Sequence, residues 1–199
     1  TIGTGHVVRC LTLGKVLREH GAKCIFICRE CRGNLVKKIR FEGFECLTLP
    51  ERQADQQQKY LEQEPESSDK YKSNIWERDA DETIEALGNR KYDWLVIDHY
   101  DLGKSYECAL RPYGNKIMVI DDLANRPHDC DLLLDQNLVA NLEKRYNKFL
   151  PEKCSSFLGP QYALLQNNYA ELRSCSQIRC GPARRVFVYF GGSDKYNLS

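Results

Sequence analysis

The sequence has no run of about 18 apolar residues, the shortest length that lets a helix cross a bilayer. It also lacks an excess of charge of one sign, because 29 Lys and Arg stand against 28 Asp and Glu, a formal net charge of +1. Proteins that bind nucleic acid or anionic membranes usually carry a basic field that this balance does not provide. We therefore expect no membrane-spanning helix, no nucleic-acid partner and no membrane partner.

Several catalytic motifs are absent as well. The sequence contains no H-E-x-x-H, no paired Cys-x-x-Cys zinc set, no G-x-S-x-G elbow and no P-loop. These absences exclude the commonest zinc hydrolases, serine hydrolases of the α/β-hydrolase type and P-loop nucleotidases. Nothing in the sequence requires a metal or an organic cofactor, and we expect neither.

Cysteine, by contrast, is abundant, with ten residues. Disulfide frameworks belong to short secreted chains without a core, whereas 199 residues of 42% hydrophobic content can bury the core of one large or two small domains. Cys24, Cys28 and Cys46 lie inside apolar runs, where cysteine behaves as a small hydrophobe. We therefore predict a reduced, cytoplasmic protein.

Three of these cysteines raise an alternative. Cys24, Cys28 and Cys31 have the C-x3-C-x2-C spacing of radical iron–sulfur enzymes that use S-adenosylmethionine, which need three thiolates converging from a loop. Cys24 and Cys28 bracket a β-rich run that would hold them about 13 Å apart at ~3.3 Å per residue. The iron–sulfur interpretation is therefore the weaker one.

Strand-like and helix-like segments alternate along most of the chain. Apolar or β-rich runs predict strands at 22–30, 44–50, 92–100, 115–122 and 130–137, and helical spacing predicts helices at 6–21, 33–43, 76–89 and 105–114. Strands that are apolar throughout are typical of a parallel sheet covered on both faces. The sequence therefore predicts an α/β, Rossmann-like domain over residues 1–154, with its first strand ahead of residue 1.

The pattern loosens from about residue 136. A second domain of the same type is predicted to begin near Ser155 and to run through 155–199, with a strand RVFVYF followed by the glycine turn GGSD. The sequence opens in one glycine loop and stops in another, so we expect a fragment cut at both ends.

The opening segment TIGTGHVVRC is the first candidate site. Ligands of doubly wound sheets collect where strand ends meet helix N-termini. Gly3 and Gly5 let the backbone approach a ligand, the helix that follows offers N–H groups to an anion, and His6 could accept a proton from water. Alternatively, the glycines serve only a turn and His6 is an N-cap or a surface residue, since the third glycine of the dinucleotide fingerprint is missing.

Two other strand ends carry candidate ligand groups. The amides of Gly191 and Gly192 can cradle a diphosphate to which Ser193 donates a hydrogen bond, although a plain turn capped by Ser193 or Asp194 is the alternative. Tyr100 has a ring that can pack on a sugar and a hydroxyl that can bind it, or else it caps the sheet edge.

Other polar residues near strand ends receive structural roles. Asp98, Asp121 and Asp122 are expected mostly to cap helices or brace loops, and His20 and His128 are expected on the surface.

Five segments occur together in this order: IGTGHVVRCLTL, DWLVIDHYDL, IMVIDDLANRPHDCDLLLDQN, LGPQYALL and FGGSDKYNLS. They resemble the UDP-2,4-diacetamido-2,4,6-trideoxy-β-L-altropyranose hydrolases of pseudaminic acid biosynthesis. The resemblance covers nearly the whole chain and thins at 51–75 and 172–183. The run VIDDLANRPHDCDLLLDQN is highly specific, whereas the glycine loops alone are not.

The resemblance implies a two-domain glycosyltransferase-B fold and a hydrolysis in which water replaces UDP at the anomeric carbon with inversion. It implies a UDP-sugar as the small-molecule partner, and we expect a monomer. His6 matches the family's catalytic base, and Tyr100 matches its sugar-contacting tyrosine. The substrate-binding loops correspond to Gly3, Gly5, Arg9, Gly191, Gly192 and Ser193.

Two other functions remain open from the sequence. A glycosyltransferase of the same fold would pass the sugar to an alcohol, and a non-catalytic fragment would only bind the nucleotide sugar. One departure from the family stands at Gln166, where an arginine often follows the ALL tripeptide.

Overall fold

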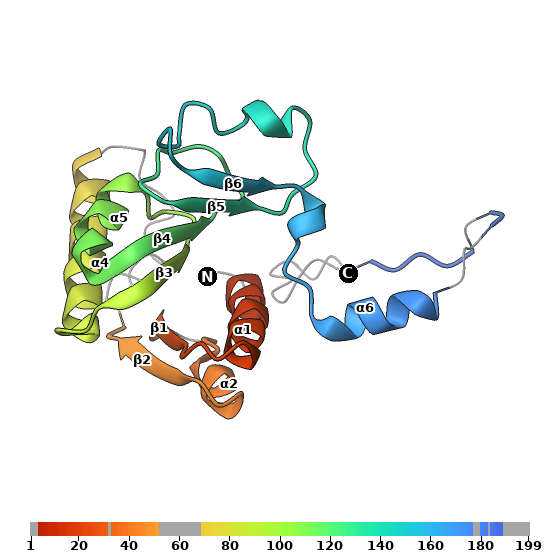
Figure 1. Cartoon of the computed structure of the whole chain (residues 1–199), viewed down its shortest axis with the longest axis horizontal. Coiled ribbons are helices and arrows are strands. Elements are labelled where there is room, and N and C mark those ends of the chain that lie inside the picture. The colour runs from red at the N-terminus through yellow and green to blue at the C-terminus, as the bar shows by residue number, and fades with distance from the viewer. Residues whose placement is uncertain (1–3, 32, 52–68, 177–179, 183, 189–199) are drawn as a thin grey trace, which may run out of the picture. The chain divides into compact units, whose positions relative to one another are not determined.

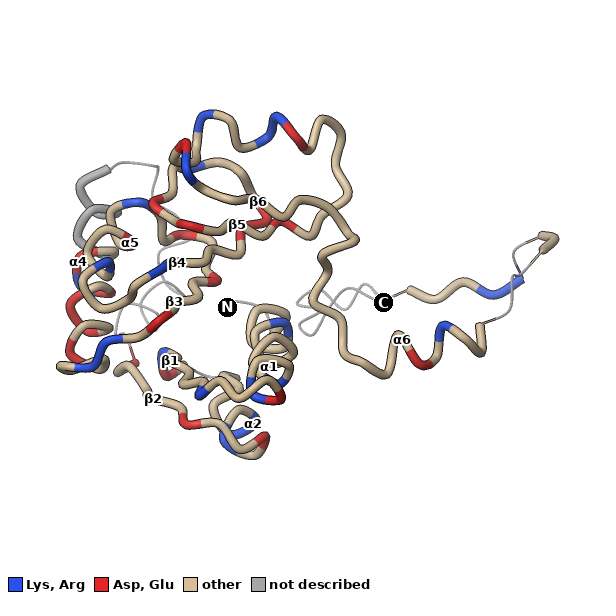
Figure 2. The backbone as a smooth tube through the Cα atoms, in the orientation of Figure 1, with Lys and Arg blue, Asp and Glu red and all other residues tan. Residues whose placement is uncertain are grey.

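The computed structural model describes residues 4–31, 33–51, 69–176, 180–182 and 184–188. The chain forms two compact units, one made of Lys23–Ala163 and the other of Thr1–Ala22 together with Leu164–Ser199. Lys and Arg are interspersed with Asp and Glu along the described backbone (Figure 2). None of the helices in the described ranges is both long and apolar enough to cross a bilayer.

The unit Lys23–Ala163 contains two parallel sheets (Figure 1). The smaller sheet pairs β1 (Ile25–Arg29) with β2 (Glu45–Leu49). The larger has the strand order β3-β4-β5-β6, with bounds β3 (Tyr92–Asp98), β4 (Gly114–Ile120), β5 (Leu132–Asp135) and β6 (Ser155–Leu158). The predicted α/β fold with parallel strands is confirmed. Because all four strands run the same way, their carboxyl ends meet at one edge of the sheet.

Burial explains why the sequences of the central strands are apolar runs that predict strands. β4 and β5 each have a neighbour on both sides, and residues 117–120 and 133–135 are buried. Edge strands differ, since β3 leaves Trp94 and Val96 exposed and β6 is exposed at 155–157.

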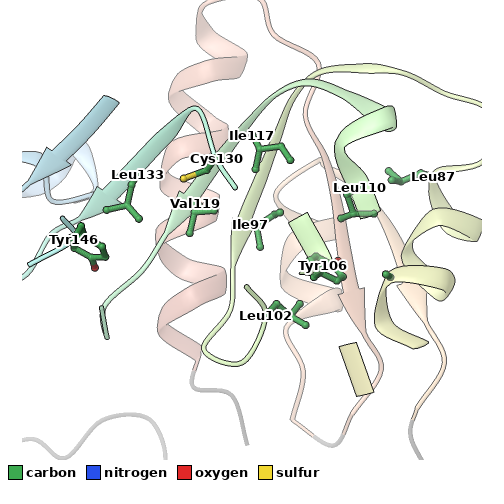
Figure 3. Close-up of a cluster of buried hydrophobic side chains, with 11 residues drawn as sticks. Leu87, Ile97, Leu102, Tyr106, Leu110, Ile117, Val119, Cys130, Leu133 and Tyr146 are labelled. Carbon is green, nitrogen blue, oxygen red and sulfur yellow. The ribbon is translucent and has the colours of Figure 1, made fainter. Parts of the chain in front are cut away.

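Helices α4 (Asp69–Leu87) and α5 (Lys104–Leu110) lie side by side next to β3 and β4 (Figure 1). Ala80 and Leu87 of α4 are buried and Trp76 and Ile84 pack against the core, and their spacing of three or four residues places them on one face of the helix. Figure 3 shows the core that these helices share with the sheet, made of Leu87, Ile97, Leu102, Tyr106, Leu110, Ile117, Val119, Cys130, Leu133 and Tyr146.

The smaller sheet is joined to α4 by charge. Arg29 of β1 pairs with Asp79 and, at 2.6 Å, with Glu82, both on α4. Helix α2 (Val36–Phe41) connects β1 to β2 and is followed by Gly43 in the left-handed region at φ +80°.

The other unit contains α1 (Thr4–Glu19) and α6 (Asn167–Ser174). The sequence predicted a glycine turn ahead of the first helix, but α1 already begins at Thr4, so Gly5 and His6 lie in its first turn. Beyond the end of α1, Gly21 has φ +88° and donates its N–H to the Arg18 carbonyl at 3.0 Å.

Two segments near the end of the chain differ from their predictions. Ser155–Leu158, where a second domain was expected to begin, pair with β5 as the fourth strand of the larger sheet. The expected strand RVFVYF is not formed in its described part, residues 185–188, where Val186 and Phe187 are 81% and 88% exposed.

Tyr106 is expected to make the unit Lys23–Ala163 less stable as the pH rises in the alkaline range. Its ring is 7% exposed, its hydroxyl lies 3.1 Å from Thr83 Oγ1, and burial raises its pKa to about 12 from an ordinary 10. Between these values the unfolded chain has lost a proton that the folded chain keeps, so stability falls as pH rises. We expect a loss of about 3 kcal/mol at most between pH 10 and 12 from this group.

Urea unfolding at pH 9 to 12 measures this loss. The fall of the unfolding free energy with pH should be less steep in Tyr106→Phe. The part that remains includes the shares of Tyr146, whose pKa is raised by burial, and of Cys130, whose pKa is raised by its contact with Cys154 and by burial. Tyr162→Phe, at an exposed tyrosine, is the control and should keep the full slope. An equal slope in the wild type and Tyr106→Phe would contradict the assignment.

Candidate functional site

His6 and Arg9 lie three residues apart in α1, which places them on one face of the helix. Arg9 Nη2 lies 3.4 Å from His6 Nδ1, and the two residues are only 9% and 7% exposed. Because a guanidinium can only donate, Nδ1 is the acceptor in this contact, and a neutral ring then carries its proton on Nε2. The structure thus brings two predicted site residues together.

Gly5 precedes this pair in the first turn of α1. A Cβ atom added to Gly5 would meet no atom of the described residues within 4 Å, so their packing does not require a glycine there. The first amides of a helix have no acceptor within the helix, which leaves them available to a ligand.

The remaining glycine-loop residues fall outside the part of the chain that the structure describes. These are Gly3, Gly191, Gly192 and Ser193. Their roles stay predictions.

Tyr100 belongs to the unit Lys23–Ala163 and follows β3 at the carboxyl edge of the larger sheet. It is 40% exposed, whereas Leu102, two residues further on, is buried in the core. Between them, the Asp101 amide donates to His99 Nδ1 at 3.0 Å and shapes the turn. The loop is therefore anchored in the core by Leu102 and exposes Tyr100.

Asp121, the residue after β4, is fully buried and carries several contacts. It accepts hydrogen bonds from the Ala124 amide at 2.7 Å and the Tyr146 hydroxyl at 3.0 Å, and its Oδ1 lies 2.9 Å from Arg126 Nη1. Burial alone would raise the pKa of Asp121, but the Ala124 amide, the Arg126 charge and the Tyr146 hydroxyl outweigh it and hold the pKa below its ordinary range. Asp121 braces a loop, as predicted.

Asp135, at the end of β5, is equally buried. It accepts from Tyr146 at 3.1 Å, from Arg145 Nη1 at 2.5 Å, and from the amide and side chain of Asn137 at 2.9 and 2.8 Å. Asn137 also donates to Asp122 Oδ1 at 3.1 Å, and Arg145 donates to the Asp122 carbonyl at 2.7 Å. The loops after β4 and β5 are therefore tied to each other.

These residues form one polar group, which we call the braced edge. It consists of Asp121, Asp122, Arg126, Asp135, Asn137, Arg145 and Tyr146. Arg126 extends it to the loop after β3 by donating to the His99 and Leu102 carbonyls. Three neighbouring strand ends are thus held in fixed relation by hydrogen bonds.

His128 is buried, so its predicted surface position is wrong. Its Nδ1 lies 2.6 Å from Glu107 Oε1, and both side chains are fully buried. Glu107 Oε2 also accepts from the Asp129 amide, and His128 Nε2 lies 3.9 Å from Asp121 Oδ2. The buried Glu107 carboxylate of α5 satisfies the ring at Nδ1, whereas Nε2 is buried and makes no hydrogen bond within the described residues.

Sequence reasoning missed most of the braced edge. Asp121 was named as a brace, but Arg126, Asp135, Asn137, Arg145 and Tyr146 received no role. The signal available was a set of polar residues directly after apolar strands. Contacts such as Arg145 with Asp135, 10 residues apart, and Arg126 with His99, 27 residues apart, cannot be assigned by spacing.

All ten cysteines lie in the described residues, and none forms a disulfide. Cys24, Cys28 and Cys31 do not form a metal-binding group, and the described residues contain no cluster of three or more His, Cys, Asp or Glu side chains placed to hold a metal. The geometry gives the iron–sulfur interpretation no support.

The fold and these features define an α/β protein with parallel sheets, a braced carboxyl edge that presents Tyr100, and a His–Arg pair at a helix start. No family model matches the chain. The chain is 28% identical over 200 residues to the UDP-2,4-diacetamido-2,4,6-trideoxy-β-L-altropyranose hydrolase of Campylobacter jejuni, which is thus a distant relative. It is also 22% identical over 203 residues to an uncharacterized protein of Methanocaldococcus jannaschii. Both comparisons cover the whole chain, which spans 59% and 36% of the lengths of these proteins.

Proposed function

We propose that the protein containing this chain is a nucleotide-sugar hydrolase that releases UDP from UDP-2,4-diacetamido-2,4,6-trideoxy-β-L-altropyranose. The observation that carries the proposal is the similarity of the entire chain to the hydrolase of Campylobacter jejuni. The His6–Arg9 pair supports it, because a hydrolysis by water needs a base and a diphosphate needs a cation.

In the proposed reaction His6 is the general base. It accepts a proton from water while the water oxygen bonds to the anomeric carbon and the bond from that carbon to the diphosphate oxygen breaks. UDP leaves with the electron pair of the broken bond. A correctly placed base contributes about 10²–10⁴-fold to such a step.

The contact with Arg9 determines which atom of His6 takes the proton. Nδ1 holds the lone pair of the neutral ring when Arg9 donates to it. We infer that the Arg9 guanidinium turns from Nδ1 to the diphosphate when substrate binds, which opens Nδ1 to water and places a cation on the leaving group.

The other roles follow the resemblance. Tyr100 contacts the sugar, Gly3 and Gly5 let the backbone approach it, and Gly191, Gly192 and Ser193 hold the diphosphate. The two domains would form a glycosyltransferase-B fold. A cytoplasmic location and a monomeric state remain predictions.

Incubation of the full-length protein with the UDP-sugar in H₂¹⁸O, without any acceptor, tests the proposal. We expect free UDP without ¹⁸O and a sugar that carries ¹⁸O at its anomeric carbon, since water attacks carbon. Label in UDP would mean attack at phosphorus and would overturn the mechanism.

The same experiment separates the other functions. UDP release only after an alcohol is added identifies a glycosyltransferase. Saturable binding of the UDP-sugar with no release under either condition identifies a non-catalytic binder.

A further inference from the structure

Arg126 joins the loop that carries Tyr100 to the rest of the braced edge. Its Nη2 donates to the His99 carbonyl at 2.6 Å and its Nε to the Leu102 carbonyl at 2.8 Å. The two acceptors bracket Tyr100 in sequence, so a single guanidinium holds both ends of the turn. A planar fork with several donors can do this, whereas a lysine ammonium cannot match the geometry.

The guanidinium itself is firmly held. Its Nη1 lies 2.9 Å from the buried carboxylate of Asp121 and 3.1 Å from Asn125 Oδ1, and the Arg126 side chain is 15% exposed. Asp121 is fixed in turn by Tyr146 and the Ala124 amide. Through Arg126 and Asp121, the loop is therefore held to the end of β4, a central strand.

The backbone around Arg126 packs closely on the same loop. The Lys104 amide donates to the Pro127 carbonyl at 2.9 Å. A Cβ on Gly103 would lie 3.1 Å from that carbonyl and 3.3 Å from Arg126 Cδ. Residues 99–104 therefore contact the segment after β4 along their length, while Tyr100 remains exposed.

We propose that Arg126 is a positioning residue, which clamps loop 99–102 and thereby fixes the Tyr100 ring for the sugar. The clamp follows from the contacts above, and its effect on the sugar rests on the proposed hydrolase function. Arg126 acts through Tyr100 and does not touch the substrate.

A double-mutant cycle on the full-length protein tests this proposal. We expect Tyr100→Ala to raise KM for the UDP-sugar about tenfold, as the loss of one good contact does. Arg126→Lys should raise KM three- to tenfold with a smaller change in kcat. The double variant should be no worse than Tyr100→Ala alone, because the clamp has nothing left to position.

Arg111→Lys is the matched control. Like Arg126, Arg111 donates hydrogen bonds both to a backbone carbonyl and to carboxylates. Its acceptors are the Asp129 carbonyl, the Asp129 side chain and the Asp131 side chain, which lie on the segment that precedes β5. Its effect on KM should be small and should add to that of Tyr100→Ala. Additive effects of Arg126→Lys and Tyr100→Ala on KM would overturn the proposal.

Hydrogen exchange gives a readout that does not depend on activity. Arg126→Lys should speed exchange of the amides of residues 100–104, while those of β4 stay protected, and Arg111→Lys should leave residues 100–104 unchanged. Unchanged exchange in Arg126→Lys overturns the clamp itself. If the wild type releases no UDP, the proposed function fails, and the exchange result still decides whether Arg126 holds the loop.

Discussion

Replacing Asp135 by alanine is expected to lower the free energy of unfolding by about 3 kcal/mol, because it removes one member of a buried ion pair and leaves the other members without a partner. Asp135 is fully buried and receives hydrogen bonds from Arg145, Tyr146 and Asn137. Arg145 is 20% exposed and recovers some hydration when Asp135 is lost, which keeps the expected cost at the low end of the usual range.

Urea denaturation followed by far-UV circular dichroism measures the loss. Asp135→Asn, which keeps an acceptor for Asn137 but removes the charge facing Arg145, should fall between the wild type and Asp135→Ala. Glu45→Ala, which breaks the exposed Arg90–Glu45 pair, is the control and should leave the urea midpoint unchanged. If Asp135→Ala behaves like Glu45→Ala, the braced edge does not stabilise the fold.

His6→Ala is expected to lower turnover of the UDP-sugar at least 10²-fold, since the proposed step loses its base. The affinity for UDP should change little, because His6 acts on water and not on the nucleotide. Steady-state kinetics of UDP release and titration with UDP measure the two quantities on the full-length protein.

The control for His6→Ala is His20→Ala. His20 directly follows α1 and is exposed, with its Nδ1 2.9 Å from the Val16 carbonyl. It should keep normal turnover. A His6→Ala enzyme within a few-fold of the wild type would remove His6 from the mechanism, even if the protein proved to be a hydrolase.

The parts of the fold that the sequence predicted are those in which local pattern and burial agree. β4 and β5 lie between two other strands and are buried, so their sequences are apolar runs. The apolar residues of α4 recur at helical spacing and lie on its buried face. β6 was missed because an edge strand that begins with two serines shows neither an apolar run nor alternation. The apolar segment at 185–188 was read as a strand although pairing depends on a neighbour, which sequence pattern does not report.

The candidate site divides in the same way. His6 was a candidate base from its place behind Gly3 and Gly5, whereas Arg9 was named only through the resemblance, and their contact follows from helical spacing. The contacts between the loops of the braced edge form only when folding brings three strand ends together, so the sequence pattern does not predict them.

The sharing of partners at the braced edge has a consequence for how such a protein can diversify. Arg126 is bonded to one neighbouring turn and Arg145 to another, and Tyr146 contacts both Asp121 and Asp135. A single turn grafted from a relative would therefore lack the hydrogen-bond partners that lie on the neighbouring turns. For the proposed hydrolase, a new sugar preference should be transferable between relatives only when the turns and their arginines are exchanged as a block.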